Sequence, residues 1–215
     1  MKKVAVIGSG AVGKTLAKGF LKHGYDTTIA SRSEEKRKAL AAEIGGNIKT
    51  ASFADAAKSA DIIVLAVKGH AAKNAITEIG IDNLKNKTVI DTGNPIADLA
   101  PVNGVLQYSS NLNKSLMEEL QEICPDAHFV KGFSCVGSAF MVEPDFGGTK
   151  PSMFICGNNE QAKVEVKEIL TKFGWEIEDM GMVEAARAIE PLAMLWCIPG
   201  MREGKWSHAF KLLKK

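Results

Sequence analysis

Eight residues near the amino terminus have the types and the spacing that bind phosphate. Residues 8–15, Gly-Ser-Gly-Ala-Val-Gly-Lys-Thr, contain the dinucleotide pattern G-x-G-x-x-G in Gly8, Gly10 and Gly13. The same run contains the mononucleotide P-loop pattern G-x-x-x-x-G-K-S/T, because a lysine and a threonine follow the last glycine. Both patterns direct backbone N–H groups and a helix N-terminus at phosphate oxygens. Phosphate binding is therefore expected here, and the rest of the sequence must distinguish the ligands.

The segments on either side of this run predict a strand, a tight turn and a helix. Residues 4–7 are an apolar run typical of a buried parallel strand, and residues 11–23 carry apolar side chains at helical spacing. Gly8 then permits the turn, Gly10 lets the backbone approach a pyrophosphate, and Gly13 lets the helix pack close to the sheet. We therefore expect the cofactor to contact these three glycines together with Ser9, Ala11 and Val12.

The end of the second predicted strand distinguishes one dinucleotide from another. Residues 25–30 predict this strand, and residues 31–33 (Ser-Arg-Ser) follow it. An NAD site has an acidic residue here for the ribose 2′-hydroxyl, whereas an NADP site has an arginine and hydroxyl residues for the 2′-phosphate. Ser31 and Arg32 therefore predict NADP, and Arg37, one turn into the next helix, is a further candidate ligand. The alternative is that both arginines are solvated surface charges beside nearby glutamates.

A P-loop enzyme is the alternative interpretation of the glycine run. Residues 88–91 predict a strand that ends in Asp91, and an acidic residue in this place can hold Mg²⁺. Against this interpretation, a nucleotide triphosphatase gives residues 31–33 no role. The loop 91–95 (Asp-Thr-Gly-Asn-Pro) also suits the edge of a dinucleotide site. We therefore favour the dinucleotide, in which case Lys14 is an ordinary exposed lysine.

Strands and helices alternate along the chain and predict an α/β fold. The strongest strand signal is the apolar run 61–67, which a lysine, a glycine and a histidine follow. Such alternation is typical of a doubly wound parallel sheet of the Rossmann type, whose ligands lie beyond the carboxyl ends of the strands. The loops after four strands then meet at one edge. Their residues join the predicted cofactor site: Ala66, Val67, Lys68, His70, Asn94 and Pro95.

The second half of the chain predicts an extension of the same domain. Strands are expected at 127–131, 153–157 and 175–180, and helices at 160–173, 183–197 and 206–213. Pro191 should kink or restart the second of these helices. We predict a single NADP-binding domain over residues 1–215, with a C-terminal extension from about residue 125 that lengthens the sheet. The apolar residues of the last helices belong either to the core or to a homodimer face: Leu192, Leu195 and Trp196.

The composition is that of an ordinary globular protein. The 215 residues carry a net charge of +2, and 46% are hydrophobic, which favours neither nucleic acid nor a membrane surface as partner. The four cysteines are not spaced for metal binding or disulfides. Neither a signal peptide nor a membrane-spanning stretch is expected. We therefore expect a cytoplasmic protein that acts on a small molecule, without a metal.

Five segments together resemble the F420-dependent NADP reductase family, and the similarity extends over nearly the whole chain. They are residues 8–13 (GSGAVG), 30–32 (ASR), 91–95 (DTGNP), 130–133 (VKGF) and 184–196 (EAARAIEPLAMLW). The resemblance is greatest to bacterial F420-reductase-like proteins, and the cytoplasmic domains of six-transmembrane metalloreductases share the same core. It implies an NADP site made by Ser9, Ser31 and Arg32. It also implies that the nicotinamide lies near Asn94, Pro95 and the loop that begins at Ser134, where a deazaflavin or flavin ring would stack.

Hydride transfer from a nicotinamide asks little of protein side chains, because the cofactor carries the chemistry. The sequence accordingly leaves the catalytic residues unassigned. His70 either contacts substrate or ribose, or merely begins a helix, and Cys135 lies in the nicotinamide loop without a visible general base. We predict an NADP(H)-dependent oxidoreductase that exchanges hydride with a deazaflavin (coenzyme F420) or flavin-like acceptor. The alternatives are a non-catalytic NADP-binding sensor and a P-loop nucleotide triphosphatase.

Overall fold

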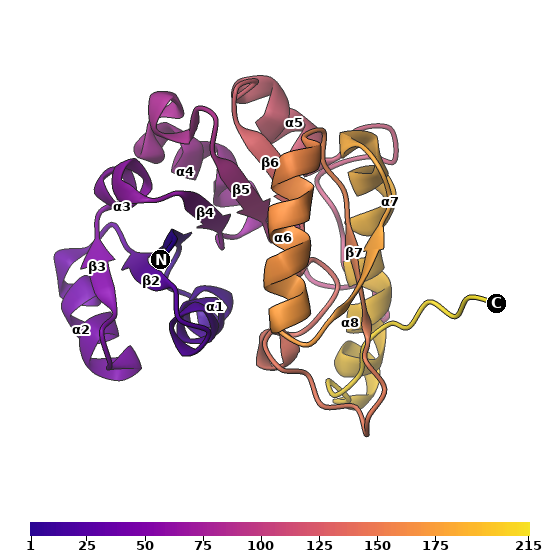
Figure 1. The fold of residues 1–215 in the computed structure, drawn as a ribbon. Coiled ribbons are helices and arrows are strands. Elements are labelled where there is room, and N and C mark those ends of the chain that lie inside the picture. Colours follow the sequence, from indigo (N-terminus) through magenta and orange to yellow (C-terminus); the bar gives the residue numbers. More distant parts are fainter.

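A six-stranded parallel sheet lies at the centre of the structure, a computed structural model that describes residues 1–215 (Figure 1). The strands lie in the order β3-β2-β1-β4-β5-β6, and every pair of neighbours is parallel. Their bounds are Lys3–Ile7 (β1), Asp26–Ala30 (β2), Lys49–Ala51 (β3), Ile62–Leu65 (β4), Thr88–Asp91 (β5) and His128–Lys131 (β6). The predicted doubly wound α/β fold of the Rossmann type is confirmed.

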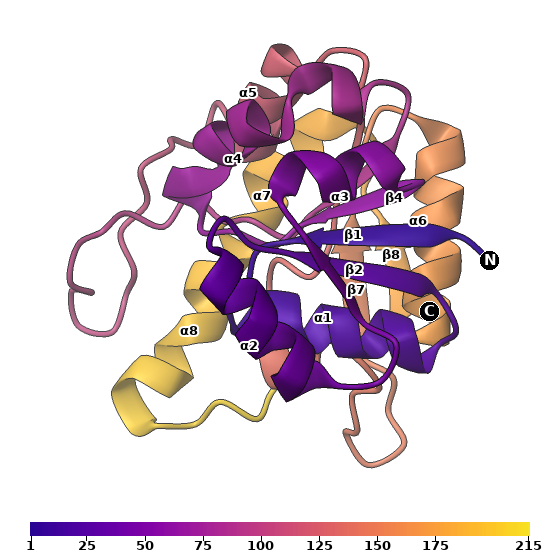
Figure 2. The same ribbon diagram turned by 90° about the vertical axis from the view of Figure 1, so that its left-hand side faces the viewer.

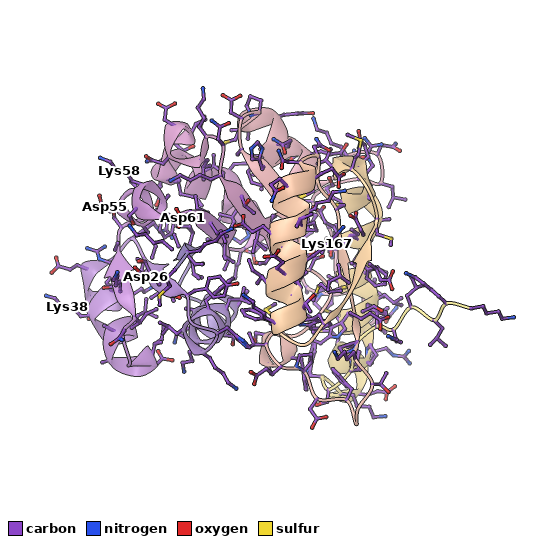
Figure 3. All side chains as sticks on the ribbon, in the orientation of Figure 1. Asp26, Lys38, Asp55, Lys58, Asp61 and Lys167 are labelled. Atoms are coloured by element: carbon purple, nitrogen blue, oxygen red, sulfur yellow. The ribbon has the colours of Figure 1, made fainter.

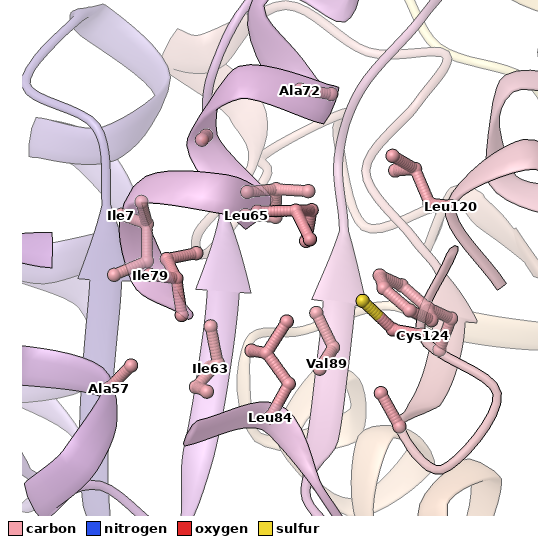
Figure 4. Close-up of a cluster of buried hydrophobic side chains, with 14 of the residues drawn as sticks. Ile7, Ala57, Ile63, Leu65, Ala72, Ile79, Leu84, Val89, Leu120 and Cys124 are labelled. Atoms are coloured by element: carbon pink, nitrogen blue, oxygen red, sulfur yellow. The ribbon is translucent and has the colours of Figure 1, made fainter. Parts of the chain in front are cut away.

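Helices cover both faces of this sheet, and each face has its own apolar core (Figure 2). On one face, Ile63, Leu65 and Val89 pack against α3 (Phe53–Ser59), α4 (Ala72–Ile79), α5 (Leu116–Ile123) and α7 (Ala186–Ile189) (Figure 4). On the other, Ile62 and Val64 pack against α1 (Ala11–Lys22), α2 (Glu34–Ile44) and α6 (Glu160–Lys172). Consecutive residues of β4 thus enter opposite cores, which is why this strand has an uninterrupted apolar sequence.

Charged side chains lie on the outer faces of the helices (Figure 3). Lys38 on α2 and Lys58 on α3 are exposed and extend away from the sheet. Lys167 on α6 forms an ion pair with Asp179 at 2.7 Å. None of the helices has the length and apolar content needed to span a membrane.

Within the C-terminal extension, residues 152–179 form a parallel β–α–β unit of their own. Its two strands, β7 (Ser152–Ile155) and β8 (Glu176–Asp179), pair with each other, and α6 connects them. A single antiparallel bridge from Lys131 to Cys156 joins this unit to β6. Of the strands predicted for the extension, β6 therefore lengthens the main sheet, whereas β7 and β8 do not. The chain meets β6 at one residue and then turns into α6, whose first turn is capped by the Asn159 side chain.

The last long helix, α8 (Leu192–Glu203), begins directly after Pro191, so the predicted restart at this proline is correct. Of its apolar residues, Trp196 is buried and Leu195 is exposed. The helix ends at Gly204, which has the left-handed φ of 69° that suits glycine. Short 3₁₀ helices complete the regular structure: Gly69–Ala71 (η1), Ile81–Leu84 (η2), Ser138–Phe140 (η3) and Val183–Ala185 (η4).

The predicted terminal helix over residues 206–213 is wrong, because this segment is bound to the smaller sheet. The Ser152 N–H donates to the Phe210 carbonyl at 2.8 Å, and the Leu212 N–H donates to Ser152 Oγ at 3.0 Å. His208 stacks on Trp196, with ring centroids 5.0 Å apart. These tertiary contacts outweigh the local helical pattern of the segment.

Candidate functional site

In the glycine turn after β1, Gly8 and Gly13 pack tightly against other backbone atoms, whereas Gly10 faces open space. A Cβ at Gly8, where φ is +123°, would lie 2.2 Å from the Ala66 carbonyl oxygen, and a Cβ at Gly13 would lie 2.1 Å from the Gly8 carbonyl oxygen. Neither position can accept a side chain. A Cβ at Gly10 would meet nothing within 4 Å. Gly10 is also the N-cap of α1 and offers no side chain to the first N–H groups, which leaves them free for an anion.

A polar cavity of about 510 Å³ lies between this turn and the end of β2. Ser31 is buried at the cavity wall, while the Arg32 side chain is 73% exposed and has only a long ion pair, 3.5 Å, with Glu78. Ser33 caps α2 by accepting from the Lys36 N–H at 3.3 Å. The cavity is lined by Gly8, Ser9, Gly10, Ser31, Arg32, Ser33, Lys36, Phe53, Ala66, Val67, Lys68, His70 and Ala71.

Arg37 is engaged by the backbone of the loop after β2, whereas its neighbour Lys36 lines the cavity. The Arg37 guanidinium donates to the carbonyls of Ser31, at 2.9 Å, and Arg32, at 3.2 Å, so it holds the loop from behind. Arg37 does not line the cavity, and its role as a ligand stays a prediction. Lys36 does line the cavity, and sequence reasoning missed it, because nothing local distinguishes it from the other lysines of α2.

A second cavity, of about 430 Å³, continues along the same edge toward β5. Its floor and walls are more apolar, with Val12, Ile96 and Ala97 among the lining residues. The two cavities have five lining residues in common, so they form one cleft across the carboxyl ends of β1, β4 and β5: Gly10, Ala66, Val67, Lys68 and His70. A cleft at the point where the strand order reverses is where doubly wound sheets bind dinucleotides.

The loop after β5 is fixed at the far end of this cleft. The Asn94 amide donates to the Ser134 carbonyl at 2.7 Å and accepts from Ser134 Oγ at 3.1 Å. Asn94 lines the second cavity, whereas Ser134 lies behind it and Pro95 is buried. A Cβ at Gly69 would lie 2.0 Å from the Asn94 carbonyl oxygen, so the loops after β4 and β5 are in direct contact.

The P-loop interpretation loses both of its supporting residues. The Asp91 carboxylate is fully buried, accepts from the Gly93 N–H at 2.9 Å and lies 2.6 Å from Lys131 Nζ, so it does not face the cleft as a Mg²⁺ ligand. The Lys14 ammonium bonds to Glu43 of α2 at 2.6 Å instead of reaching over the glycines. Asp91 therefore has a structural partner, and Lys14 is an ordinary first-turn lysine.

The two residues considered for catalysis lie in contrasting environments. His70 is exposed on η1 and lines both cavities, so its ring is available to a ligand. Cys135 is 3% exposed, and burial raises the pKa of its thiol to about 12. Since the thiolate is the nucleophile, burial disfavours the reactive form of Cys135.

Comparisons with known proteins agree with this geometry. Residues 3–95 match the family model described as NADP oxidoreductase, coenzyme F420-dependent. The chain is 25% identical over 202 residues to the metalloreductase STEAP3 of Rattus norvegicus, which covers 92% of this chain and 38% of that protein. It is also 25% identical over 213 residues to the uncharacterized oxidoreductase YfjR of Bacillus subtilis (strain 168), which covers 99% of this chain and 68% of the other. The chain thus spans well under half the length of the metalloreductase.

A solved structure has the same fold from end to end. A candidate F420-dependent NADP reductase from Arthrobacter sp. FB24 superposes with a TM-score of 0.92, at 29% sequence identity and with both chains fully covered. The likeness therefore includes the C-terminal unit as well as the sheet.

Proposed function

We propose that the chain, whose residues 3–95 match the family model described as NADP oxidoreductase, coenzyme F420-dependent, transfers a hydride between NADP(H) and a deazaflavin or flavin-like acceptor. One observation carries this proposal. Two cavities share the glycine turn, one of them polar and basic and the other more apolar. A dinucleotide and its reaction partner need such a pair, with charge for the phosphates and a flat apolar space for the reacting rings.

The basic cavity is the proposed site of the adenosine half. The free N–H groups at the start of α1 would bind the pyrophosphate, and Ser31, Arg32 and Lys36 would bind the 2′-phosphate. The exposed guanidinium of Arg32 can turn to the phosphate without breaking a buried contact. The cavity thus adds Lys36 to the cofactor set predicted from the sequence, which stays a proposal: Gly8, Ser9, Gly10, Ala11, Val12, Gly13, Ser31, Arg32, Arg37, Ala66, Val67, Lys68, His70, Asn94, Pro95 and Ser134.

The apolar cavity is the proposed site of the nicotinamide and the acceptor. Bound NADPH would supply the hydride, so the part of the protein is to orient the ring and to exclude water. Val12 and Ile96 offer apolar surface, and Asn94 is held still by Ser134. His70, exposed at the junction of the cavities, is placed to contact the ribose or the acceptor.

The test is a stopped-flow measurement of NADPH oxidation under anaerobic conditions. NADPH absorbance at 340 nm should fall when F420, FMN or FAD is added, and NADH should be a poorer donor. Ferric chelates form a separate arm of the experiment. Tight binding of NADPH without oxidation by any acceptor would contradict the enzyme and support the sensor. Failure to bind NADPH would contradict both.

We also propose a cytoplasmic location and a homodimer. All four cysteines are free thiols, which suits a reducing compartment. The exposed apolar side chains of Leu195, Met201 and Trp206 lie on or just after α8 and are suited to a self-complementary face. Light scattering coupled to gel filtration should give the mass of a dimer, and a monomer at micromolar concentration would contradict this part of the proposal.

A further inference from the structure

Lys131, at the end of β6, has an ammonium group that is fully buried among charged partners. Its Nζ lies 2.6 Å from Asp91 Oδ2 and 2.7 Å from Glu190 Oε1, and it donates to the Gly93 carbonyl at 2.9 Å. The three side chains are at most 2% exposed. Burial lowers the pKa of Lys131, but the carboxylates of Asp91 and Glu190 outweigh this effect and hold the pKa above its ordinary value. The lysine is therefore a buried cation.

The second carboxylate of this group binds a helix end. Glu190 accepts from the Leu116 N–H at 3.0 Å and from the Met117 N–H at 3.1 Å, which are the first two N–H groups of α5. Two carboxylates and one ammonium leave one negative charge, and the N-terminus of α5 is where a helix favours such a charge. The group thus connects β5, β6, α5 and the residue that follows α7 without an unpaired charge.

The same contacts fix the backbone of the cleft. Gly93 lines the apolar cavity, and both of its peptide groups are held, the N–H by Asp91 and the carbonyl by Lys131. The next residue, Asn94, is held by Ser134, whose Oγ also lies 3.5 Å from the carbonyl oxygen of Ile189, the neighbour of Glu190. None of these hydrogen bonds reaches β2 or α2.

We propose that Lys131, with Asp91 and Glu190, is a positioning residue for the nicotinamide half of the site and not for the adenosine half. The inference rests on the proposed function, because it takes the apolar cavity as the place of the nicotinamide. A well-packed apolar trio could stabilise the fold equally well, whereas an ammonium group with three fixed partners gives the loop after β5 one backbone position. Loss of the network should therefore loosen that loop and leave the glycine turn and Arg32 unaffected.

The experiment compares two ligands by calorimetry. Adenosine 2′,5′-bisphosphate reports the adenosine half alone, and NADPH reports both halves. In Lys131→Met the Kd for the bisphosphate should change by less than about twofold, while the Kd for NADPH should rise about tenfold, the size expected for lost charge-assisted contacts. Glu190→Gln keeps the shape of the side chain and loses its charge. It should also weaken NADPH binding and spare the bisphosphate, with a smaller rise in the Kd for NADPH.

Lys163→Met is the matched control. Lys163 is also a buried lysine, 3% exposed, and pairs with Glu160 at 2.8 Å and Asp179 at 3.3 Å, but it belongs to α6 and the smaller sheet. The variant Lys163→Met should lower the Tm and leave the Kd values for the bisphosphate and for NADPH unchanged. Equal weakening of both ligands in the Lys131 and Glu190 variants would overturn the inference, and so would no weakening of either. The inference would also be overturned if both variants failed to fold while Lys163→Met folded. Failure of the wild-type protein to bind NADPH would instead overturn the proposed function.

Discussion

The two ends of the cleft are built in opposite ways. At the end of β1 and β2, the ligand-facing groups are backbone N–H groups and exposed basic side chains, and Arg32 has almost no partner within the protein. At the end of β5 and β6, the charges of Lys131 and Asp91 are fully buried and paired with each other. One end keeps its charges available for a ligand, and the other uses its charges to hold a loop.

This difference shows that exposed charges are suited to bind a ligand, whereas buried and paired charges are suited to hold the backbone in place. An exposed guanidinium binds a phosphate strongly because nothing in the protein competes for it. A buried ammonium group with three partners cannot reach a ligand, but it fixes the peptide groups around it, since any movement would leave a buried charge unpaired.

The glycine turn is where a substitution should have the largest effect. Gly8→Ala places a Cβ at a φ of +123° and 2.2 Å from the Ala66 carbonyl oxygen, so the turn must open. We expect NADPH affinity to fall about 100-fold or more, or the protein to become insoluble. Gly10→Ala is the control, because its Cβ meets no protein atom. It should keep the wild-type Tm and lose affinity only by crowding the pyrophosphate. Wild-type affinity in Gly8→Ala would contradict the account of this turn.

Arg32→Ala should have the next largest effect and separate the two cofactors. We expect the Kd for NADPH to rise about 10- to 100-fold and the Kd for NADH to stay within about twofold, because only NADPH has the 2′-phosphate. Nicotinamide fluorescence reports both titrations. Lys38→Ala removes an exposed charge of α2 that pairs only with Glu34, and it should change neither Kd. Equal losses for NADPH and NADH in Arg32→Ala would refute the 2′-phosphate site.

The ion pair between Glu118 on α5 and Arg187 on α7 should make the stability of the fold depend on pH. The Arg187 guanidinium bonds to Glu118 and holds the pKa of that carboxyl at about 2, against an ordinary value of 4.5. Because the folded-state pKa is the lower one, the pair stabilises the fold above pH 4.5 and loses this effect as the pH falls through 2. Glu118→Gln should lower the Tm by about 3–6 °C at pH 7.

The difference in Tm between wild type and Glu118→Gln should shrink on acidification, as measured by thermal unfolding at several pH values. Glu122→Gln removes an exposed partner of Lys114 from the same helix and serves as the control, with little change at any pH. A constant difference between pH 7 and pH 3 would show that the ion pair with Arg187 is not its cause.

Lys14→Ala should have the smallest effect. Its ammonium bonds to Glu43 and not to the glycine loop, and exposed ion pairs contribute little. We expect less than about a twofold change in the Kd for NADPH, measured by the same fluorescence titration. A loss as large as that of Arg32→Ala would restore the P-loop interpretation.

The contrast between the two ends also explains what the sequence can predict. The glycine turn, Ser31 and Arg32 lie within single strand–loop–helix units, so local patterns suffice to place them at one edge. The network of Lys131 joins residues that are 40 or more positions apart in the sequence. No local sequence pattern predicts such a pairing. Lys36 was missed for a related reason, since only the folded loop shows which lysine of α2 faces the cavity.

The terminal segment shows the limit of helical periodicity. Residues 206–213 have a helical pattern, but Phe210 bonds to Ser152 of β7 and His208 stacks on Trp196. Partners more than ten residues away decide its conformation, and periodicity within the segment contains no information about them.

A crystal structure of the complex with NADP⁺ tests both ends of the cleft at once. The account predicts the 2′-phosphate within hydrogen-bond distance of Ser31 and Arg32, the pyrophosphate at the N–H groups after Gly8, and the nicotinamide beside Asn94 in the apolar cavity. An adenosine that binds elsewhere, or a nicotinamide that lies outside the cavity bounded by Asn94 and Ile96, would contradict it.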